Sequence, residues 1–483
     1  MITSPGTLVS GLFISRLLNH TITKKLYLCA FIFSQKLYLI SSMNFKISTI
    51  FIFFVMIATS CFEFSGKYSK LPPGYWRGEL SLSPKNITPN PEAKPLPEKV
   101  GLKFDEVMEG QLPFVFEVKY TNDSLFYIEI INGEERIKVT DIQYGRDRRT
   151  AKDTILINFP EYDSYIHAVC ESGVMEGEFV IKSKDNYRIP FTAKHGTNIR
   201  FTELKKTPAM DISGAWQTTF DQNTDKPWDA IGVFKQNGNQ LTGTFKTETG
   251  DFRYLEGTVQ DKKLYLSCFD GAHAYLFEAQ IEPDSTIQGS FRSGLSEPSL
   301  WSAKRNPDFK LKDADSITKT KPGKETVHFN LPNPEGKNIS PDNKEYQGKV
   351  KIIQVMGSWC PNCKDETKFL TDFLSKADTS KVAVIALSFE RYKEVDKANE
   401  MLIKYKKALN VPYEIVLGGN SNKTEAGQKL DFLDELRAYP TMLILDKTNK
   451  IRKIHTGFSG PATDEFNKFR DEFGTFIEIL LKE

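Results

Sequence analysis

The sequence has few cysteines and almost no net charge. Its 483 residues include six cysteines, which is too few for a disulfide-stabilised scaffold of this length. Lys and Arg number 64 against 62 Asp and Glu, so the formal net charge of +2 gives no support for a nucleic-acid partner. At roughly 100–200 residues per domain, the length suggests about three domains.

The sequence also lacks a second metal-ligand motif to accompany its Cys-x-x-Cys pair, Cys360 and Cys363. A structural zinc site needs four ligands, and neither another Cys-x-x-Cys nor a His-x-x-x-His pair is present. We therefore expect no metal site. Zinc binding and a purely structural disulfide remain as less favoured alternatives to a redox-active dithiol.

The dithiol interpretation is favoured because the pair lies in Trp359-Cys360-Pro361-Asn362-Cys363, at a predicted strand-to-helix junction. The apolar run over 350–356 predicts a buried strand, and the apolar spacing after Cys363 predicts a helix. A helix N-terminus stabilises anions, and Cys-x-x-Cys thiols there can have a pKa lowered from about 8.5 to roughly 3.5–7.5. Since thiolates attack disulfides, we expect Cys360 to attack and Cys363 to resolve.

Four ordered segments resemble the TlpA/ResA-type thiol–disulfide oxidoreductases, which have the thioredoxin fold. They are an opening hairpin over 327–350, the active-site segment 350–366, the segment 438–446 and a closing turn over 457–461. The resemblance covers roughly residues 322–483. It implies an enzyme that reduces disulfide-bearing proteins outside the cytoplasm, in cytochrome c maturation or in repair. Electrons would come from a membrane thiol protein, with no bound cofactor.

The resemblance also implies roles for residues near the two cysteines. Pro440 is expected to form a cis peptide bond with Tyr439, whose backbone would pair with a bound polypeptide. An ordinary trans proline at the start of an edge strand is the alternative. Trp359 and Pro361 are expected beside the sulfurs, where they would contact substrate and exclude water.

Two further residues bear on proton transfer. Glu366 is expected on the first turn of the helix, where the resemblance implies that it modulates the protonation of the sulfurs. The alternative is a plain carboxylate favoured by the helix dipole. Gln354 occupies the position at which cytoplasmic thioredoxins have a buried aspartate, so Glu366 or water would have to replace that proton acceptor.

The N-terminal part resembles an export signal. Residues 43–60 combine a short basic start with an apolar centre, and Ser60-Cys61 is similar to the end of a bacterial lipoprotein signal. We expect Cys61 to be acylated and residues 1–42 to be an over-extended reading frame. A membrane-spanning anchor is the alternative, but the apolar run is short for the roughly twenty residues that a span requires. The predicted location is the cell envelope, periplasm-facing and anchored in a membrane through lipid.

Short strands with turn signals at regular spacing fill residues 61–205 and 206–306. The second stretch repeats the plan of the first, since Gly214-Ala215-Trp216 corresponds to Gly74-Tyr75-Trp76. This pattern predicts two antiparallel β-barrel or sandwich modules, and the Gly-x-Trp strand is similar to that of lipocalin-like barrels. We expect both tryptophans in the module cores.

The predicted fold class is therefore multidomain, with two N-terminal antiparallel β modules and a C-terminal α/β thioredoxin-like domain. A polar linker over 307–325 leads into the redox domain over 326–483, where a helix is expected over 423–438. The modules are expected to be spacers, docking surfaces or dimerisation elements. The alternative function is a ligand- or glycan-binding envelope lipoprotein that works through its β modules. A peroxidase is disfavoured because no Pro-x-x-x-Thr-x-x-Cys pattern surrounds Cys360.

Overall fold

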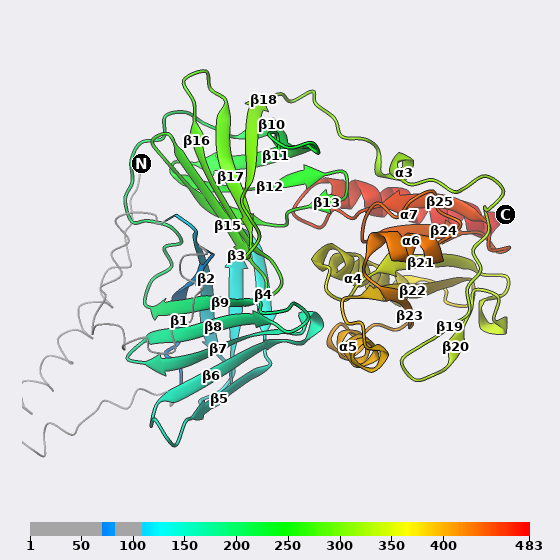
Figure 1. Cartoon of the computed structure of the whole chain (residues 1–483), viewed down its shortest axis with the longest axis horizontal. Coiled ribbons are helices and arrows are strands. Elements are labelled where there is room, and N and C mark those ends of the chain that lie inside the picture. The colour runs from blue at the N-terminus through cyan, green and yellow to red at the C-terminus, as the bar shows by residue number, and fades with distance from the viewer. Residues whose placement is uncertain (1–69, 83–108) are drawn as a thin grey trace, which may run out of the picture. The chain divides into compact units, whose positions relative to one another are not determined.

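The computed structural model describes residues 70–82 and 109–483 (Figure 1). The predicted reading-frame extension over 1–42, the signal over 43–60 and Cys61 lie outside the described residues. Among the helices that are described, none combines the length and the apolar character needed to cross a membrane.

The first module is a nine-stranded antiparallel sheet in the order β4-β3-β2-β1-β9-β8-β7-β6-β5. Most neighbours in this sheet are consecutive along the chain, and β1 also pairs with β9, which joins the start of the module to its end. The strands are β1 Gly74–Ser81, β2 Gln111–Tyr120, β3 Phe126–Asn132, β4 Glu135–Val139, β5 Ile142–Arg146, β6 Asp153–Phe159, β7 Ser164–Glu171, β8 Val174–Ile181 and β9 Arg188–His195. The short helix η2, Pro160–Tyr162, follows β6.

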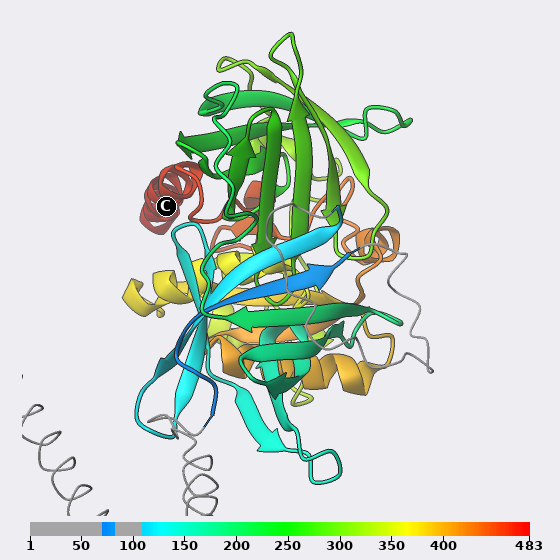
Figure 2. The same ribbon diagram turned by 90° about the vertical axis from the view of Figure 1, so that its left-hand side faces the viewer.

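The second module is a closed antiparallel sheet, drawn in green in Figures 1 and 2. Its order is β11-β10-β18-β17-β16-β15-β14-β12-β13, and an additional pairing of β11 with β12 closes the circle. Its strands are β10 Gly214–Phe220, β11 Trp228–Asn237, β12 Gln240–Thr247, β13 Gly250–Asp251, β14 Leu255–Gln260, β15 Lys263–Phe269, β16 Ala274–Ile281, β17 Ile287–Ser293 and β18 Ser299–Arg305.

The predicted repeat is visible at equivalent positions of the two sheets. Gly74 and Gly214 begin β1 and β10 with φ values of 103° and 106°, a region that only glycine adopts readily. Two residues later, Trp76 and Trp216 are fully buried, and each indole N–H donates to the carbonyl oxygen four residues upstream, at 3.1 Å and 2.8 Å. In each module the indole ring is buried and its N–H group has a hydrogen-bond acceptor, which explains why both modules begin with the same motif.

The two modules share part of one core. Phe269, at the end of β15 in the second module, packs into the apolar core of the first module. Its ring centroid lies 4.5 Å from that of Phe114 and 5.0 Å from that of Phe179. The side chain of Asn132 at the end of β3 also donates to the Phe269 carbonyl, at 2.9 Å. The modules are therefore packed against each other and are not joined by a free tether.

The C-terminal domain has a five-stranded mixed sheet in the order β23-β22-β21-β24-β25. The first three strands of that order are parallel, β24 runs antiparallel to β21, and β25 runs antiparallel to β24. The elements are α3 Ala314–Ile317, β19 Leu331–Pro332, β20 Asn338–Ile339, η3 Lys344–Tyr346, β21 Val350–Met356, α4 Pro361–Lys376, β22 Val382–Glu390, α5 Val395–Ala408, β23 Glu414–Asn420, α6 Lys423–Lys429, β24 Thr441–Leu445, β25 Ile451–Thr456 and α7 Glu465–Lys482. The fold-class prediction is confirmed: two mainly β modules precede an α/β thioredoxin-like domain.

The predicted helix over 423–438 is wrong in its second half, because α6 ends at Lys429. The following segment pairs with the linker instead: Lys321 donates its N–H to the Phe432 carbonyl, and Asp434 donates its own to the Lys319 carbonyl, at 2.9 Å and 2.8 Å. Phe432 and Leu433 are buried in the domain core. Tertiary packing with the linker thus replaces the helical hydrogen bonds that the local sequence favours.

Candidate active site

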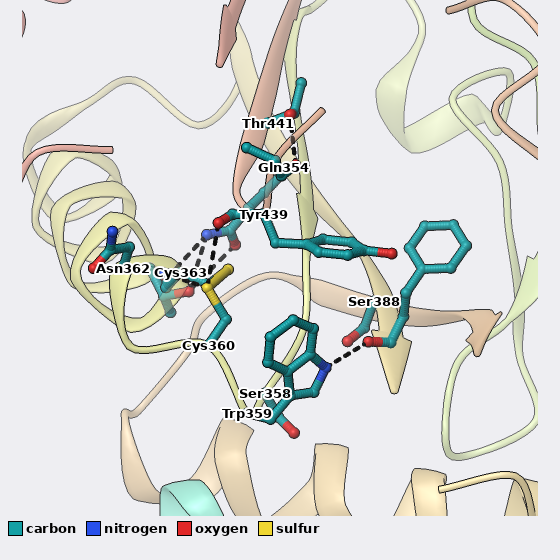
Figure 3. The surroundings of a disulfide bond; sticks show 12 residues. Gln354, Ser358, Trp359, Cys360, Asn362, Cys363, Ser388, Tyr439 and Thr441 are labelled. Atoms are coloured by element: carbon teal, nitrogen blue, oxygen red, sulfur yellow. Dashed lines mark hydrogen bonds between the residues drawn. A yellow bond between two sulfur atoms is a disulfide. The ribbon is translucent and has the colours of Figure 1, made fainter. Parts of the chain in front are cut away.

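The two cysteines lie where the central strand gives way to the first helix of the redox domain. All seven residues of β21 are buried, and α4 begins directly after Cys360, which is its N-cap residue. Cys360 and Cys363 form a disulfide with their Cα atoms 5.2 Å apart (Figure 3). The Cys363 N–H donates to the Cys360 sulfur at 3.2 Å, which is the contact that would stabilise a thiolate there. Cys360 is 6% exposed and Cys363 is fully buried, so only the first is accessible.

Aromatic and proline residues surround the accessible sulfur. The Cys360 Sγ lies 3.5 Å from the Tyr439 carbonyl oxygen, and the Tyr439–Pro440 peptide bond is cis, as the resemblance implies. Trp359 donates its indole N–H to the Phe389 carbonyl at 2.9 Å and meets the Tyr439 ring edge-on at 5.4 Å (Figure 3). The strand ends therefore hold these groups in place beside the disulfide.

Glu366 lies on the second turn of α4, not on the first, because the helix begins at Pro361. Its side chain is fully buried, and neither carboxyl oxygen has a hydrogen-bond partner among the described residues. Burial raises the pKa of Glu366 to about 8, and the nearby Gln354 amide opposes this only in part. The dipole of a helix N-terminus favours the ionised form, so the dipole interpretation does not describe this carboxyl.

The side chain of Gln354 is engaged elsewhere. It donates to the Cys363 carbonyl at 3.3 Å and to the Thr367 hydroxyl at 3.1 Å, and it accepts from the Tyr413 hydroxyl at 3.2 Å. The amide thus links the central strand to the active-site helix. An amide cannot accept the proton that an aspartate would accept at this position, which leaves Glu366 as the buried acid of this helix.

A second buried carboxyl, Glu390, lies at the end of β22 and was not predicted from the sequence. It accepts the Ser358 N–H at 2.9 Å, the Ser358 hydroxyl at 2.7 Å and the Ser388 hydroxyl at 2.6 Å. Burial raises its pKa even though these donors favour the ionised form. Arg391 follows, with its guanidinium 4.5 Å from the centre of the Trp359 ring. The sequence does contain a signal for these two residues, because Glu390 and Arg391 are charged and stand at the carboxyl end of a buried parallel strand. Ligands of α/β sheets commonly bind at this end of the strands.

Charged residues of α4 contact both β modules. Buried Arg253 of the second module forms ion pairs with Asp365 of α4, with Glu135 of the first module and, at 3.2 Å, with Asp270. In the structure Asp365 is 9% exposed, and this one arginine joins all three parts of the chain beside the disulfide.

We expect Arg253→Met to destabilise the protein by about 3–5 kcal/mol, because the change leaves two buried carboxylates and one half-buried carboxylate without their shared cation. Methionine has a similar length, so the loss of charge dominates over the loss of volume. Urea unfolding of the whole chain measures the effect. Arg148→Met is the control, since Arg148 is exposed in the turn after β5. An equal stability of the two variants would contradict the proposed linking role of Arg253.

Two more residues hold the start of α4. The Asn362 side chain donates to the Asp251 carbonyl of the second module at 3.4 Å. Lys364 pairs with Glu161 of the first module at 2.5 Å, and its ammonium lies 4.4 Å from the centre of the Tyr162 ring. The first turn of the active-site helix is therefore held from both sides.

Most of the predicted site residues gather in one place. Trp359, Cys360, Pro361 and Tyr439 line a cleft of about 310 Å³. Cys363 and Glu366 lie buried behind it on α4. The predicted lipidation site, Cys61, lies outside the described residues. Among the described residues, no cluster of side chains suitable for holding a metal ion is present.

Comparisons with known proteins concern the C-terminal domain. Residues 322–454 match the AhpC/TSA family. The thiol–disulfide oxidoreductases ResA of Bacillus thuringiensis subsp. konkukian (strain 97-27) and Bacillus cereus (strain ATCC 10987) are each 30% identical over 129 residues, which is 27% of this chain. The chain spans 66% of the length of these relatives, or about two thirds.

Solved structures match the same part of the chain. A thiol-disulfide oxidoreductase from Bacteroides fragilis is 20% identical, covering 30% of this chain and 97% of that one, with a TM-score of 0.23. StoA from Bacillus subtilis is 21% identical, covering 30% of this chain and 96% of that one, with a TM-score of 0.22. Residues 322–454 are thus an AhpC/TSA-family domain, and the predicted resemblance to the ResA-type thiol–disulfide oxidoreductases is confirmed for this part of the chain.

Proposed function

We propose that this chain is an extracytoplasmic thiol–disulfide oxidoreductase that reduces protein disulfides through Cys360 and Cys363. The observation that carries the proposal is the position of Cys360, which caps α4, accepts the Cys363 N–H and lines a cleft. A structural disulfide needs none of these three features. The described strand and helix supply the electrostatic stabilisation that an attacking thiolate requires.

The reaction begins from the reduced dithiol. The Cys360 thiolate attacks one sulfur of the substrate disulfide, forming a mixed disulfide and releasing one substrate thiolate, which takes up a proton. The Cys363 thiol then loses its proton and attacks Cys360, which releases the second substrate thiolate and forms the Cys360–Cys363 bond. Two electrons pass from the protein to the substrate.

Glu366 is proposed to exchange the proton of Cys363. The two residues are three apart on α4, so their side chains lie on the same face of the helix. With its pKa raised to about 8 by burial, Glu366 holds a proton at neutral pH and is able to release it within the physiological range. An ordinary exposed glutamate, with a pKa near 4.3, would be a poorer match to a thiol.

Substrate is proposed to bind along Trp359, Pro361, Tyr439 and Pro440. Three of these four residues line the cleft, and the Tyr439 backbone adjoins the sulfur. An extended polypeptide could add its backbone hydrogen bonds here in the manner of an extra strand. The Tyr439 carbonyl oxygen lies 3.5 Å from the Cys360 sulfur.

We further propose an envelope location with lipid attached at Cys61. The signal-like pattern over 43–60 supports export, and Ser60-Cys61 supports acylation. Outside the cytoplasm the oxidised enzyme would need a membrane thiol protein as its electron donor, and cytochrome c maturation is one process that consumes such electrons. Radiolabelled lipid incorporation that is lost in Cys61→Ser would test the anchor.

The reduction potential of the Cys360–Cys363 pair tests the direction of the reaction. We expect a value near or below about −270 mV, the potential of thioredoxin, because the proposed role is that of a reductant. Equilibration with dithiothreitol redox buffers, followed by alkylation of free thiols, measures it. A value near about −120 mV, typical of the oxidant DsbA, would reverse the direction. Absence of any dithiol couple would refute the proposed function.

A further inference from the structure

The cleft over Cys360 is built by three parts of the chain. The redox domain supplies Cys360 and Arg391, the turn between β8 and β9 supplies Lys184, and the second module supplies Phe252 and Tyr275. The β modules therefore form walls of the cleft that contains the reactive sulfur. Its volume of about 310 Å³ is at the low end of the range for small-molecule pockets. A cleft of this size admits a small disulfide or one extended segment.

Two cations face this cleft from different parts of the chain, and neither forms an ion pair with a described residue. Lys184 is half-buried, with its ammonium 4.4 Å from the centre of the Tyr187 ring. Arg391 is half-buried against Trp359. Burial is the main cause that lowers the pKa of Lys184 to about 8, and repulsion from Arg391 is the second. Burial also lowers the pKa of Arg391, although the nearby Glu390 acts in the opposite direction. Both side chains have lost part of their hydration, and neither has an ion-pair partner in the part of the chain that the structure describes. Two such neighbouring cations favour the binding of an anion between them.

The acidic groups near the cleft do not serve as that anion. Glu390 is fully buried and already accepts hydrogen bonds from Ser358 and Ser388. Asp251 lines the cleft but is only 3% exposed, and it accepts the Arg253 N–H at 2.9 Å. The remaining lining is rich in aromatic rings, which bind the apolar part of a ligand.

We propose that the cleft selects disulfides that carry a carboxylate, which lies between Lys184 and Arg391 while the disulfide reaches Cys360. The proposal rests on the proposed function and names its substrate class: an anionic small disulfide or an extended acidic segment of a polypeptide. The electrons come from the reduced Cys360–Cys363 dithiol. One substrate disulfide is converted to two thiols for each protein disulfide formed.

Three small disulfides of similar length test the charge preference: 3,3′-dithiodipropionate, which is anionic, bis(2-hydroxyethyl) disulfide, which is neutral, and cystamine, which is cationic. The whole chain is reduced, freed of reductant and mixed with each in a single turnover. Each rate is divided by the rate of the same disulfide with dithiothreitol, which corrects for intrinsic reactivity. We expect the anionic compound to exceed the neutral one by about tenfold at low salt, and less at high salt.

The variant Lys184→Glu is expected to abolish the charge preference, because the new carboxylate pairs with Arg391 and leaves the cleft with no net charge. Lys184→Gln should lower the anionic-to-neutral ratio by several-fold without abolishing it, and it guards against misfolding of the charge-reversed variant. Lys182→Glu is the matched control, because Lys182 lies in the same turn, is exposed and does not line the cleft. The control should keep the ratio of the unmodified chain.

A second arm uses two unfolded peptides, each with one disulfide, flanked by glutamates in one and by lysines in the other. A preference for the acidic peptide alone identifies extended segments as the substrate, and a preference among the small compounds alone identifies small disulfides. Equal corrected rates in both arms would overturn the substrate class and leave the proposed function standing. Failure to reduce any disulfide would refute the proposed function as well.

Discussion

Replacement of Cys360 by serine is expected to abolish disulfide reduction, with a loss of at least about a thousandfold. Cys360 is the accessible member of the pair, and it is the sulfur that accepts the N–H at the start of α4. A serine hydroxyl is not ionised near neutral pH, and it cannot form the mixed disulfide that the reaction requires. Insulin reduction by the whole chain, with dithiothreitol as electron source, measures the loss.

Two other cysteine variants sharpen this experiment. Cys363→Ser leaves the attacking thiol but removes the resolving one, so a mixed disulfide with substrate should accumulate and be visible on a non-reducing gel. Cys170→Ala is the control with full activity expected, because burial raises the pKa of Cys170 to about 12 and keeps it as an inert thiol. Retained activity in Cys360→Ser would move the chemistry away from this pair and towards the alternative in which the β modules act alone.

Replacement of Glu366 by glutamine is expected to make the redox domain less sensitive to alkaline pH. The pKa of Glu366 rises from its usual 4.5 to about 8 in the folded protein because of burial. The folded state therefore binds this proton more tightly than the unfolded chain does, and ionisation between these two values destabilises the fold. One pKa unit corresponds to about 1.4 kcal/mol. The unfolding free energy of Glu366→Gln minus that of the unmodified chain should therefore increase by about 4 kcal/mol between pH 5 and pH 9.

Urea unfolding followed by circular dichroism at 222 nm measures this effect in the whole chain. Within the described residues the α-helices α3 to α7 all follow residue 306, so the helical signal reports on the C-terminal part. Asp372→Asn is the matched control on the same helix, because its carboxyl is 64% exposed and pairs with Lys376. A difference between Glu366→Gln and the unmodified chain that stays constant from pH 5 to pH 9 would show that this carboxyl does not titrate in that range.

Local patterns were sufficient for several parts of the fold. The buried run over 350–356 and the apolar spacing after Cys363 predicted β21 and α4, and the cysteines lie at the junction as expected, Cys360 as the N-cap of α4 and Cys363 in its first turn. The Gly-x-Trp motifs predicted two buried tryptophans at the start of two antiparallel sheets. These features depend on the period of apolar residues and on turn chemistry, both of which are contained in a short stretch of chain.

Other parts depended on contacts that no short stretch contains. The helix expected over 423–438 ends early because the linker pairs with Leu433 and its neighbours. The alternative for Glu366 was a carboxylate favoured by the helix dipole, but burial by the rest of the domain raises the pKa of this group. Glu390 and Arg391 were not predicted as site residues, because only the fold places Glu390 against Ser358 and Arg391 against Trp359.

The sequence by itself determined the redox pair, the thioredoxin-like fold around it and the two β modules before it. These follow from residue spacing and hydrophobic period, which act over a few residues at a time. The tertiary structure decided what the modules do at the site: Arg253 and Glu161 hold the first turns of α4, and Lys184 lies at the cleft over Cys360. The physical reason is that ion pairs and cleft walls join residues more than a hundred positions apart, and their energies depend on burial that only the folded chain creates.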